Sequence, residues 1–410
     1  MTSREIYIRG EVSSSADAVW AIAGDFCGLW HPVIATIEAE QGGSIRRFTV
    51  KGEDTVYREQ LTYFSASDRT YSYTHLEGIR DVKSYEASFT VTPMDDANCQ
   101  IVWCAKLIAA EPRAAAIAEG TGIVFQMGID AIRAMVPRAV TLSGTPAIAM
   151  TIAGNPSETL CLFLHGIGGA RWNWAKQLPV AAQYMQAAAM DLRGYGESQL
   201  GNAPSVVDDY CDDILRAMTQ QKVKQVVLVG LSYGSWIATS FAMRHPEKLV
   251  GLVLSGGCTG MSEASVEERD QFRTSREVPL NEGKTPKDFA SAVVNVIASP
   301  HATEQIRQEL FNSMAAIPVA TYRDALQCFT QTKERFDFSK LNMPVLFITG
   351  EHDKLAMPAE IRGVSQRVHS AAPNPKVRFE VIAGAGHVCN VEAPQAFNVL
   401  LQTFLQGLAP

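Results

Sequence analysis

The sequence predicts an α/β fold: a mostly parallel sheet flanked by helices and carrying a helical cap, preceded by a smaller α+β domain. The length of 410 residues exceeds the size of one ordinary domain. Near residue 137 the hydrophobic pattern changes, and prolines and glycines interrupt it. Before this point apolar and polar residues alternate, whereas after it short apolar runs alternate with helical stretches. We therefore expect two domains, at residues 1–137 and 138–410.

The first domain is predicted to contain an antiparallel sheet and two helices. In residues 84–91 polar and apolar side chains alternate strictly, which indicates a strand with one buried face. A short helix is expected after Ser15. A long helix is expected at 111–136, where apolar residues recur along one helical face from Phe125 to Val136. Weaker strand patterns lie at 4–11, 45–50, 55–64, 69–76 and 99–108.

The second domain is predicted to contain a parallel sheet covered by helices on both faces. Near-continuous apolar runs, typical of strands buried on both faces, lie at 160–164, 226–229, 249–254 and 345–349. The region from about 260 to 340 lacks such runs, and its sequence is polar and typical of helices. Because it lies between two of the expected core strands, we predict that it forms an inserted cap.

The composition limits the classes of function. A net charge of -7 and a pI near 5.7 argue against nucleic-acid binding, which needs a basic surface. The N-terminal residues lack the apolar segment of a signal peptide, and no apolar stretch is long enough to span a membrane. The eight cysteines are scattered singly, which fits buried thiols in a reducing compartment better than disulfides or a zinc site. We therefore expect a cytoplasmic protein that acts on a small molecule.

The strongest functional signal is the sequence GLSYG at residues 230–234, directly after an apolar run and before a helical stretch. A serine at this strand-to-helix turn stands in a tight bend, which the flanking glycines allow. Its hydroxyl then projects above the carboxyl end of the sheet, where ligands bind in this architecture. We expect Ser232 to be a nucleophile; the alternative is an ordinary turn serine.

A serine hydroxyl needs a base that takes its proton. His387 lies in a glycine-rich loop near the C-terminus, after the nucleophile and after any plausible acid in chain order. His352 is a weaker candidate because it adjoins the expected acid, and His165 belongs to another motif. The remaining histidines lack a comparable setting and are expected at the surface or in the core: His31, His75, His245, His301 and His369.

The base in turn needs a carboxylate that fixes its tautomer and stabilises the imidazolium. Asp353 follows the apolar run PVLFITG and is our choice for this acid. Glu351, two residues earlier, is the competitor. A helix cap or a turn is the structural alternative for either residue.

The oxyanion formed by attack on a carbonyl needs hydrogen-bond donors. Residues 165–169 (HGIGG) follow an apolar strand and can bring backbone N–H groups to the site. We expect the donors to be the N–H groups of Ile167 and Tyr233; a plain glycine turn is the alternative. Gly166 and Trp236 are further candidates for contact with the substrate.

Five motifs in one order make residues 138–408 resemble the α/β-hydrolase family: HGIGG, MDLRGYGES (190–198), GLSYGS, ITGEHDKLAMP (348–358) and GAGH. The DLRGYGES segment, Trp174 and LVLSGG (252–257) are most similar to the branch of enol-lactonases and cofactor-free esterases. The resemblance implies a Ser232–His387–Asp353 triad, an acyl-enzyme intermediate and a helical cap that shapes the pocket. Ser232 distinguishes the chain from haloalkane dehalogenases, which have an aspartate at this position.

The first domain more loosely resembles the helix-grip fold of the START-like and polyketide-cyclase (SRPBCC) group. An early helix, six or so strands and a long final helix come in the same order, and residues 24–32 are similar to the group's segment around its second helix. The resemblance implies an apolar cavity that would hold the same substrate, serve a second enzyme or be filled by core side chains. The candidates to line it are His31, Tyr71, Tyr73 and Trp103.

We expect a hydrolase of an ester or lactone bond in a small, fairly apolar molecule of cyclic or polyketide-like character. The N-terminal domain would assist substrate binding, and no metal or organic cofactor is expected. Two alternatives stay open: the same triad could cleave a carbon–carbon bond of a β-diketone or ring-fission product, or the chain could bind a ligand with weak or no turnover. The sequence does not assign the oligomeric state.

Overall fold

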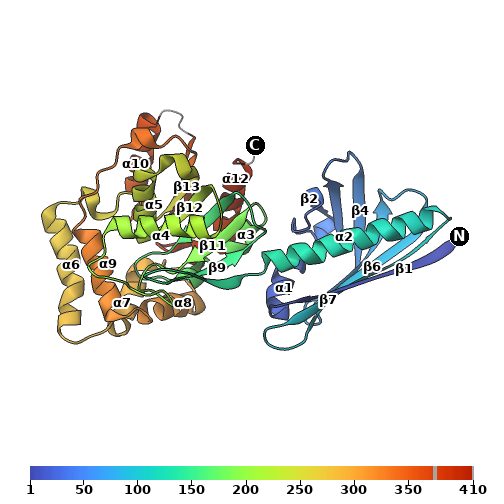
Figure 1. Cartoon of the computed structure of the whole chain (residues 1–410), viewed down its shortest axis with the longest axis horizontal. Coiled ribbons are helices and arrows are strands. Elements are labelled where there is room, and N and C mark those ends of the chain that lie inside the picture. The colour runs from blue at the N-terminus through green and yellow to red at the C-terminus, as the bar shows by residue number, and fades with distance from the viewer. Residues whose placement is uncertain (373–375, 409–410) are drawn as a thin grey trace. The chain divides into compact units, whose positions relative to one another are not determined.

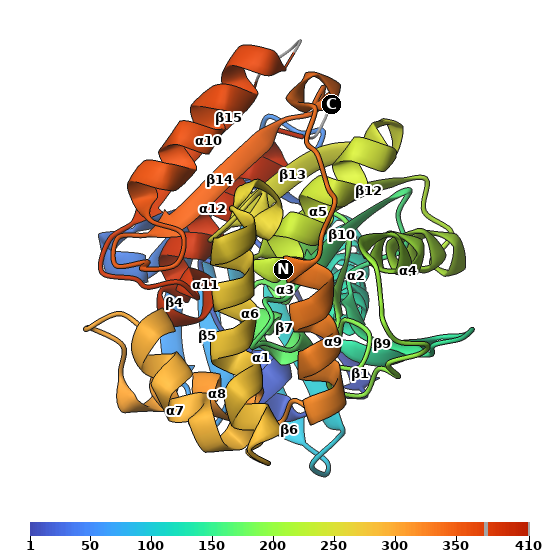
Figure 2. The ribbon, with the colours of Figure 1, turned by 90° about the vertical axis from the view of Figure 1, so that its left-hand side faces the viewer.

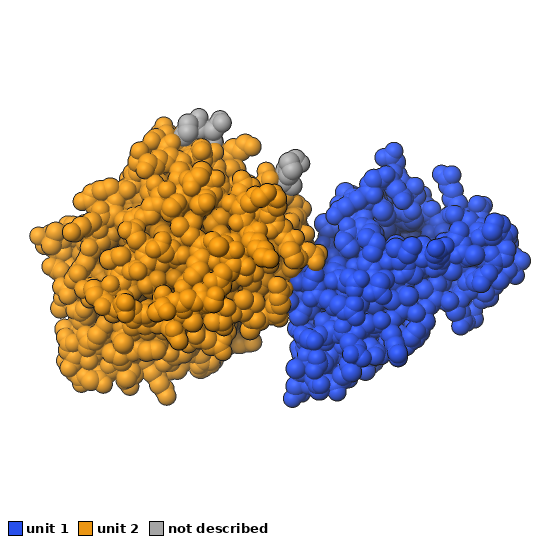
Figure 3. Space-filling view, viewed as in Figure 1, with its two compact units in different colours: residues 1–136 blue, residues 137–410 orange. Residues whose placement is uncertain are grey.

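The computed structural model describes residues 1–372 and 376–408. The chain divides into two compact units, Met1–Val136 (unit 1) and Pro137–Pro410 (unit 2), which Figure 3 shows in different colours. The division lies where the hydrophobic pattern of the sequence changes.

Unit 1 is an α+β domain built on an antiparallel sheet of seven strands in the order β1-β7-β6-β5-β4-β3-β2. Helix α2 runs across the sheet and contacts β1 and β7 (Figure 1). The strands are β1 (Thr2–Val12), β2 (Ile34–Glu40), β3 (Ile45–Val50), β4 (Val56–Ser65), β5 (Thr70–Glu77), β6 (Val82–Pro93) and β7 (Cys99–Ala109), and the helices are α1 (Ala16–Ala23) and α2 (Arg113–Met135).

The alternating pattern of residues 84–91 predicts the buried face of β6 correctly, because its four apolar side chains are buried and the polar ones between them are not. The helix expected after Ser15 is α1, whose N-terminus the Ser15 hydroxyl caps by accepting the Ala18 N–H at 3.3 Å. Strand β2 was not expected, because only its first residue, Ile34, is buried. Residues 24–32 form turns rather than the surroundings of a second helix.

Helix α2 is the one helix among the described residues that is long and apolar enough to cross a membrane by length and composition. No apolar stretch of this length was expected from the sequence. The core helix of a folded domain can pass the same test, and 28% of the apolar stretch of α2 is buried. In unit 1 the side chains of Phe125, Ile129 and Ile132 are buried. These are the residues whose spacing predicts one apolar helical face.

Unit 2 has the predicted α/β architecture. Its described strands form a mixed, mostly parallel sheet in the order β15-β14-β13-β12-β10-β11-β9-β8, in which β8 and β9 pair antiparallel at one edge. The strands are β8 (Arg138–Leu142), β9 (Ile148–Ala153), β10 (Thr159–Leu164), β11 (Gln186–Met190), β12 (Gln225–Leu231), β13 (Leu249–Ser255), β14 (Val345–Gly350) and β15 (Val377–Ile382). The helices outside the cap are α3 (Leu178–Ala182), α4 (Val207–Gln220), α5 (Tyr233–Arg244), α10 (Pro358–Ala371), α11 (Cys389–Glu392) and α12 (Pro394–Gln406).

Four helices lie between the adjacent strands β13 and β14: α6 (Val266–Asn281), α7 (Pro286–Ile297), α8 (Glu304–Ala315) and α9 (Val319–Thr330). Helix α6 packs on α9 and α7 packs on α8, so the segment forms two helix pairs (Figure 2). Polar caps define where they begin: Ser265 and Glu268 exchange hydrogen bonds at the start of α6, and the Thr303 hydroxyl accepts the Ile306 N–H at the start of α8. We refer to these helices as the cap.

Candidate active site

Ser232 stands in the turn between β12 and α5, in a strained backbone conformation with φ 53° and ψ -111°. Such a conformation costs a non-glycine residue about 1–3 kcal/mol and tends to occur at functional sites. The glycines on either side of Ser232, Gly230 and Gly234, lie too close to other backbone atoms to carry a side chain. A Cβ atom at Gly230 would overlap the carbonyl of Gly234, and a Cβ atom at Gly234 would overlap the carbonyl of Leu164.

Hydrogen bonds to the neighbouring strand hold this turn. The Ser232 N–H donates to the carbonyl of Ser255, at the end of β13, at 2.8 Å. The fully buried hydroxyl of Ser235 accepts the Ser255 N–H at 3.1 Å and lies 2.7 Å from the carbonyl of Gly230, to which it can donate. The carboxyl ends of β12 and β13 therefore fix the backbone on both sides of Ser232.

The structure brings His387 and Asp353 together. Nδ1 of His387 lies 2.8 Å from Oδ2 of Asp353, and both side chains are buried. The other carboxylate oxygen of Asp353 accepts the N–H groups of Leu355 and Ala356 at 2.8 and 2.9 Å. Burial raises the pKa of Asp353, but the nearby His387 and these hydrogen bonds outweigh it, so that the pKa lies below its ordinary value. Asp353 is therefore held as a carboxylate facing His387.

The competing acid, Glu351, points elsewhere. Its carboxylate accepts the Gly384 N–H at 2.9 Å, and its side chain is 56% exposed. It also lies 4.0 Å from Nε2 of His352, whose ring packs against that of His301. Neither Glu351 nor His352 takes part in the Asp353–His387 pair.

Two successive glycines that follow β13 lie next to His387 and Ser232, respectively. A Cβ atom on Gly256 would lie 3.1 Å from the His387 ring, and one on Gly257 would lie 3.4 Å from the carbonyl oxygen of Ser232. Within residues 1–372 and 376–408, no hydrogen bond joins the Ser232 hydroxyl to His387. Nucleophile–base bonds are often long before substrate binds and tighten in the complex.

The loop that follows β10 passes beside the nucleophile. A Cβ atom at Gly166 would make van der Waals contact with Cβ of Ser232 at 3.4 Å. The next carbonyl, of Ile167, accepts a hydrogen bond from the buried hydroxyl of Tyr195 at 3.0 Å. Tyr233 is the first residue of α5, so its N–H has no acceptor within the helix. Tyr195 was missed by sequence reasoning, because its partner is a backbone atom distant in the chain.

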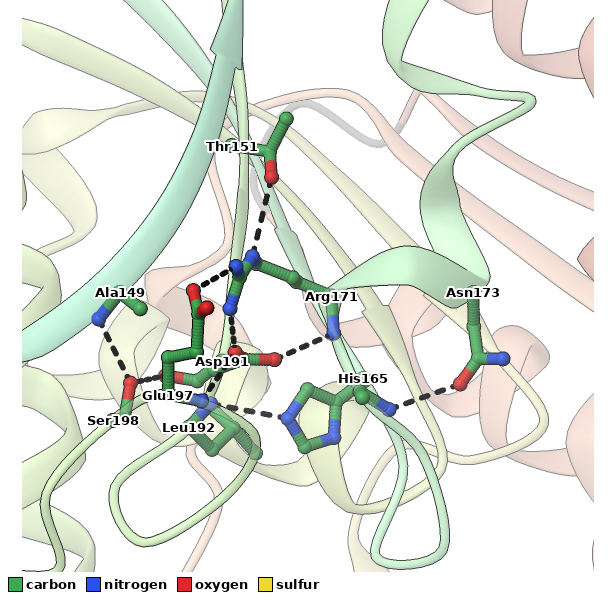
Figure 4. A network of polar contacts seen from close by, with 10 residues as sticks. Ala149, Thr151, His165, Arg171, Asn173, Asp191, Leu192, Glu197 and Ser198 are labelled. Carbon is green, nitrogen blue, oxygen red and sulfur yellow. Dashed lines mark hydrogen bonds and ion pairs between the residues drawn. The ribbon is translucent and has the colours of Figure 1, made fainter. Parts of the chain in front are cut away.

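A polar network fixes the base of this loop (Figure 4). The Arg171 guanidinium pairs with the fully buried Asp191 and with Glu197. Nε2 of His165 accepts the Leu192 N–H at 3.0 Å, while its Nδ1 lies 2.8 Å from the carbonyl of Gly166. These contacts require that the proton lies on Nδ1. Because burial lowers the pKa of the His165 ring, the ring is neutral and holds the loop through these two hydrogen bonds.

Trp236 lies in α5, a helix that is buried along nearly its whole length. Its Nε1 donates to the Ser262 hydroxyl at 2.9 Å, and its ring stacks on that of Tyr233 and meets Phe329 edge-on. The structure thus gives Trp236 a packing role between α5 and the cap, and its contact with a substrate stays a prediction.

Aromatic side chains form a buried cluster in unit 1. Trp103 donates to the Tyr73 hydroxyl at 3.1 Å, and His31 lies 3.0 Å from the Val124 carbonyl. Tyr71 packs in the same cluster and is fully buried. An open groove of about 600 Å³ lies on the sheet of this unit, and the residues that line it include Tyr73 and the exposed Glu5, Glu86 and Lys106.

Comparison with known proteins agrees with both folds. Residues 160–394, more than half of the chain, match the family described as alpha/beta hydrolase fold, and the chain belongs to this family. Residues 5–136 match the family described as polyketide cyclase/dehydrase and lipid transport, so unit 1 is an SRPBCC-like domain. These matches confirm the resemblances found in the sequence.

Particular relatives are distant. The chain is 21% identical to 3-oxoadipate enol-lactonase 2 of Acinetobacter baylyi, covering 62% of this chain and 91% of that protein. It is 25% identical to epoxide hydrolase 3 of Xenopus tropicalis, covering 62% and 73%. A thermophilic esterase from Thermogutta terrifontis shares the fold with a TM-score of 0.56 and 23% identity, covering 67% and 99%. The family and these names support an enzyme of the hydrolase class.

Proposed function

We propose that unit 2 is a serine hydrolase that cleaves an ester or lactone bond in a small, fairly apolar molecule. The observation that carries this proposal is the 2.8 Å contact between His387 and Asp353, beside a serine in a strained strand-to-helix turn. A buried carboxylate that orients an imidazole near such a serine is the arrangement that nucleophilic acyl transfer needs. Relatives named as an enol-lactonase and an esterase support the choice of bond.

In the proposed reaction the Ser232 oxygen attacks the carbonyl carbon while Nε2 of His387 takes the hydroxyl proton. Asp353 keeps the proton on Nδ1 and stabilises the imidazolium that forms. The tetrahedral intermediate collapses as His387 returns its proton to the leaving alkoxide, which leaves an acyl-enzyme. Water, deprotonated by His387, then attacks the acyl group and releases the acid and free Ser232.

The negative charge of the tetrahedral intermediate needs donors that are already in place. The proposed donors are the backbone N–H groups of Ile167 and Tyr233. The position of Gly166 against Ser232 supports the first, and the place of Tyr233 at the N-terminus of α5 supports the second. The Tyr195 hydroxyl and the Arg171–Asp191 pair would keep the Ile167 loop in position.

We further propose that unit 1 assists the binding of an apolar substrate. Its match to a family described by polyketide cyclases and lipid transport supports this role. Kinetic comparison of the full chain with a chain beginning at residue 138 tests it. A truncated chain that is folded but has a raised KM supports assistance in binding, whereas unchanged kinetics contradict it.

The central test measures hydrolysis of aryl esters, lactones and β-diketones by wild type, Ser232→Ala and His387→Ala, with the exposed Ser370→Ala as control. A fluorophosphonate probe reports labelling of the nucleophile. The proposal expects ester or lactone cleavage and labelling in wild type and the control, and loss of both in the two site variants. Cleavage of diketones alone would indicate carbon–carbon hydrolysis. Absent turnover and absent labelling would indicate a binding protein.

A further inference from the structure

The segment that joins α7 to α8 in the cap touches the loop of the proposed base. The His387 N–H donates to the carbonyl of Ile297, the last residue of α7, at 2.8 Å. Two residues further on, the Ser299 carbonyl accepts a hydrogen bond from Arg307 of α8 at 2.8 Å. We call residues 297–299 the strap. It links the backbone of His387 directly to the cap.

Glu392 also accepts a hydrogen bond from the strap. This residue ends α11, and its Oε2 accepts the Ser299 N–H at 2.9 Å. Its second oxygen, Oε1, is buried and has no hydrogen-bond partner among the described residues. A buried carboxylate oxygen without a partner is costly. The proposed function does not use Glu392, so its position calls for another explanation.

The strap and Glu392 both pack closely against Gly386, which lies in the loop of the proposed base. A Cβ atom there would lie 2.5 Å from the Ile297 carbonyl oxygen, 2.6 Å from the Ser299 nitrogen and 2.7 Å from Oε1 of Glu392. Only glycine allows this approach, and the residue that follows it is His387. The groups are therefore packed too closely for one to move without displacing the others.

We propose that Glu392 is a positioning residue for His387 and acts through the strap; this inference rests on the proposed function. Asp353 orients the imidazole ring from the side-chain end, whereas the Glu392–Ser299 bond fixes the Ile297 carbonyl that holds the His387 backbone. Without the carboxylate, the Ser299 N–H loses its acceptor and the strap relaxes. A base displaced by about 1 Å can lower turnover on the order of 100-fold, while binding of substrate is unchanged.

A purely structural role for Glu392 makes a different prediction. Loss of a stabilising contact would lower the fraction of folded protein, and activity would fall in proportion. A positioning role lowers kcat per folded molecule and leaves KM in place. Glutamine keeps an oxygen that can accept the Ser299 N–H, so it should restore a positioning role.

The test compares Glu392→Ala and Glu392→Gln in the full chain, with Glu304→Ala as the matched control. Glu304 is an exposed carboxylate in the first turn of α8, close to the strap in sequence. Steady-state kinetics are measured on the ester that wild type hydrolyses fastest. The kcat of each variant is divided by its folded fraction, which circular dichroism measures. We expect kcat to fall about 10- to 100-fold in Glu392→Ala with KM within about 3-fold, and Glu392→Gln and Glu304→Ala to stay within about 3-fold of wild type. Glu392→Asp, which withdraws the carboxylate by one methylene, replaces the alanine variant if that variant does not fold.

Three outcomes overturn the inference. Glu392→Ala could have the same kcat as Glu304→Ala, Glu392→Ala could change KM alone, or Glu392→Gln could be as impaired as Glu392→Ala. His387→Ala, measured in parallel, separates this failure from failure of the proposed function. If His387→Ala keeps its activity, both proposals fall. If His387→Ala is inactive and Glu392→Ala is not impaired, only the positioning role falls.

Discussion

Asp353 and His387 come from two separate loops, after β14 and β15, and their side chains meet with 2.8 Å between Oδ2 and Nδ1. Because β14 and β15 are parallel neighbours, both loops leave the sheet at the same edge. The sheet topology thus creates the pair, and the N–H groups of residues 355 and 356 fix its carboxylate.

Asp353→Asn should lower kcat on the order of 10³- to 10⁴-fold while the protein stays folded. An amide in place of the carboxylate can donate to Nδ1, which favours the tautomer that cannot accept the serine proton. Steady-state kinetics check this prediction. Glu351→Gln is the control and should stay within a few-fold of wild type, since Glu351 contacts the Gly384 backbone instead. A greater loss in the Glu351 variant would reverse the assignment of the acid.

Gly234→Ala should lower the free energy of unfolding by about 3 kcal/mol, because the new methyl group overlaps the Leu164 carbonyl. Urea unfolding measures the change. Gly363→Ala is the opposite case: this glycine lies inside α10 with no atom near its virtual Cβ, and alanine should stabilise by about 0.5–1 kcal/mol. Equal unfolding midpoints for the two variants would contradict the tight packing described for the nucleophile turn.

Unit 1 should lose stability as the pH falls from 7 to 4. Burial lowers the pKa of His31 from 6.5 to about 4, so the unfolded chain takes up a proton there before the folded one does. The contribution is complete above pH 6.5 and is lost by about pH 4, at a cost of about 3 kcal/mol. Urea unfolding across this range should give a flatter pH dependence for His31→Gln than for wild type. His369→Gln, at an exposed position of α10, should keep the wild-type dependence.

Tyr195→Phe should lower kcat about 3- to 10-fold and leave KM nearly unchanged, because it removes one hydrogen bond to the Ile167 carbonyl. Tyr210→Phe provides the matched control. The Tyr210 hydroxyl is also buried, but Tyr210 packs on the Tyr233 ring and not on the Ile167 carbonyl, so loss of its hydroxyl should not loosen the Ile167 loop. Identical kinetics for the two variants would show that the Tyr195 bond does not position the loop.

The sequence predicts those parts of the molecule that local rules determine. Ser232 stands out in the sequence because a strand, two glycines and a helix leave a signal within a few residues of each other, and its role as nucleophile stays a prediction. The α/β class followed from apolar runs such as 226–229, which lie in the middle of β12. The edge strand β2 was not predicted, because a strand with one buried residue shows no alternating hydrophobic pattern.

Residues whose partners are distant backbone atoms could not be found from the sequence. Tyr195 meets Ile167 across 28 positions, and Glu392 meets Ser299 across 93. Almost every residue has a backbone carbonyl that can accept a hydrogen bond and an N–H that can donate one. The sequence therefore does not indicate which backbone group a given side chain contacts. Such contacts become visible only when the fold places the two segments side by side.

The place of the cap between two adjacent parallel strands has a consequence for how specificity can evolve. The ladder that pairs Leu252 of β13 with Val345 of β14 does not depend on the length or sequence of the chain between them. Caps of different shape can therefore be exchanged between relatives without rebuilding the sheet. The bond from His387 to Ile297 sets a limit to this modularity. A cap taken from a relative would have to keep the contacts that residues 297–299 make with Gly386. This short segment is therefore the part of the cap that cannot vary freely.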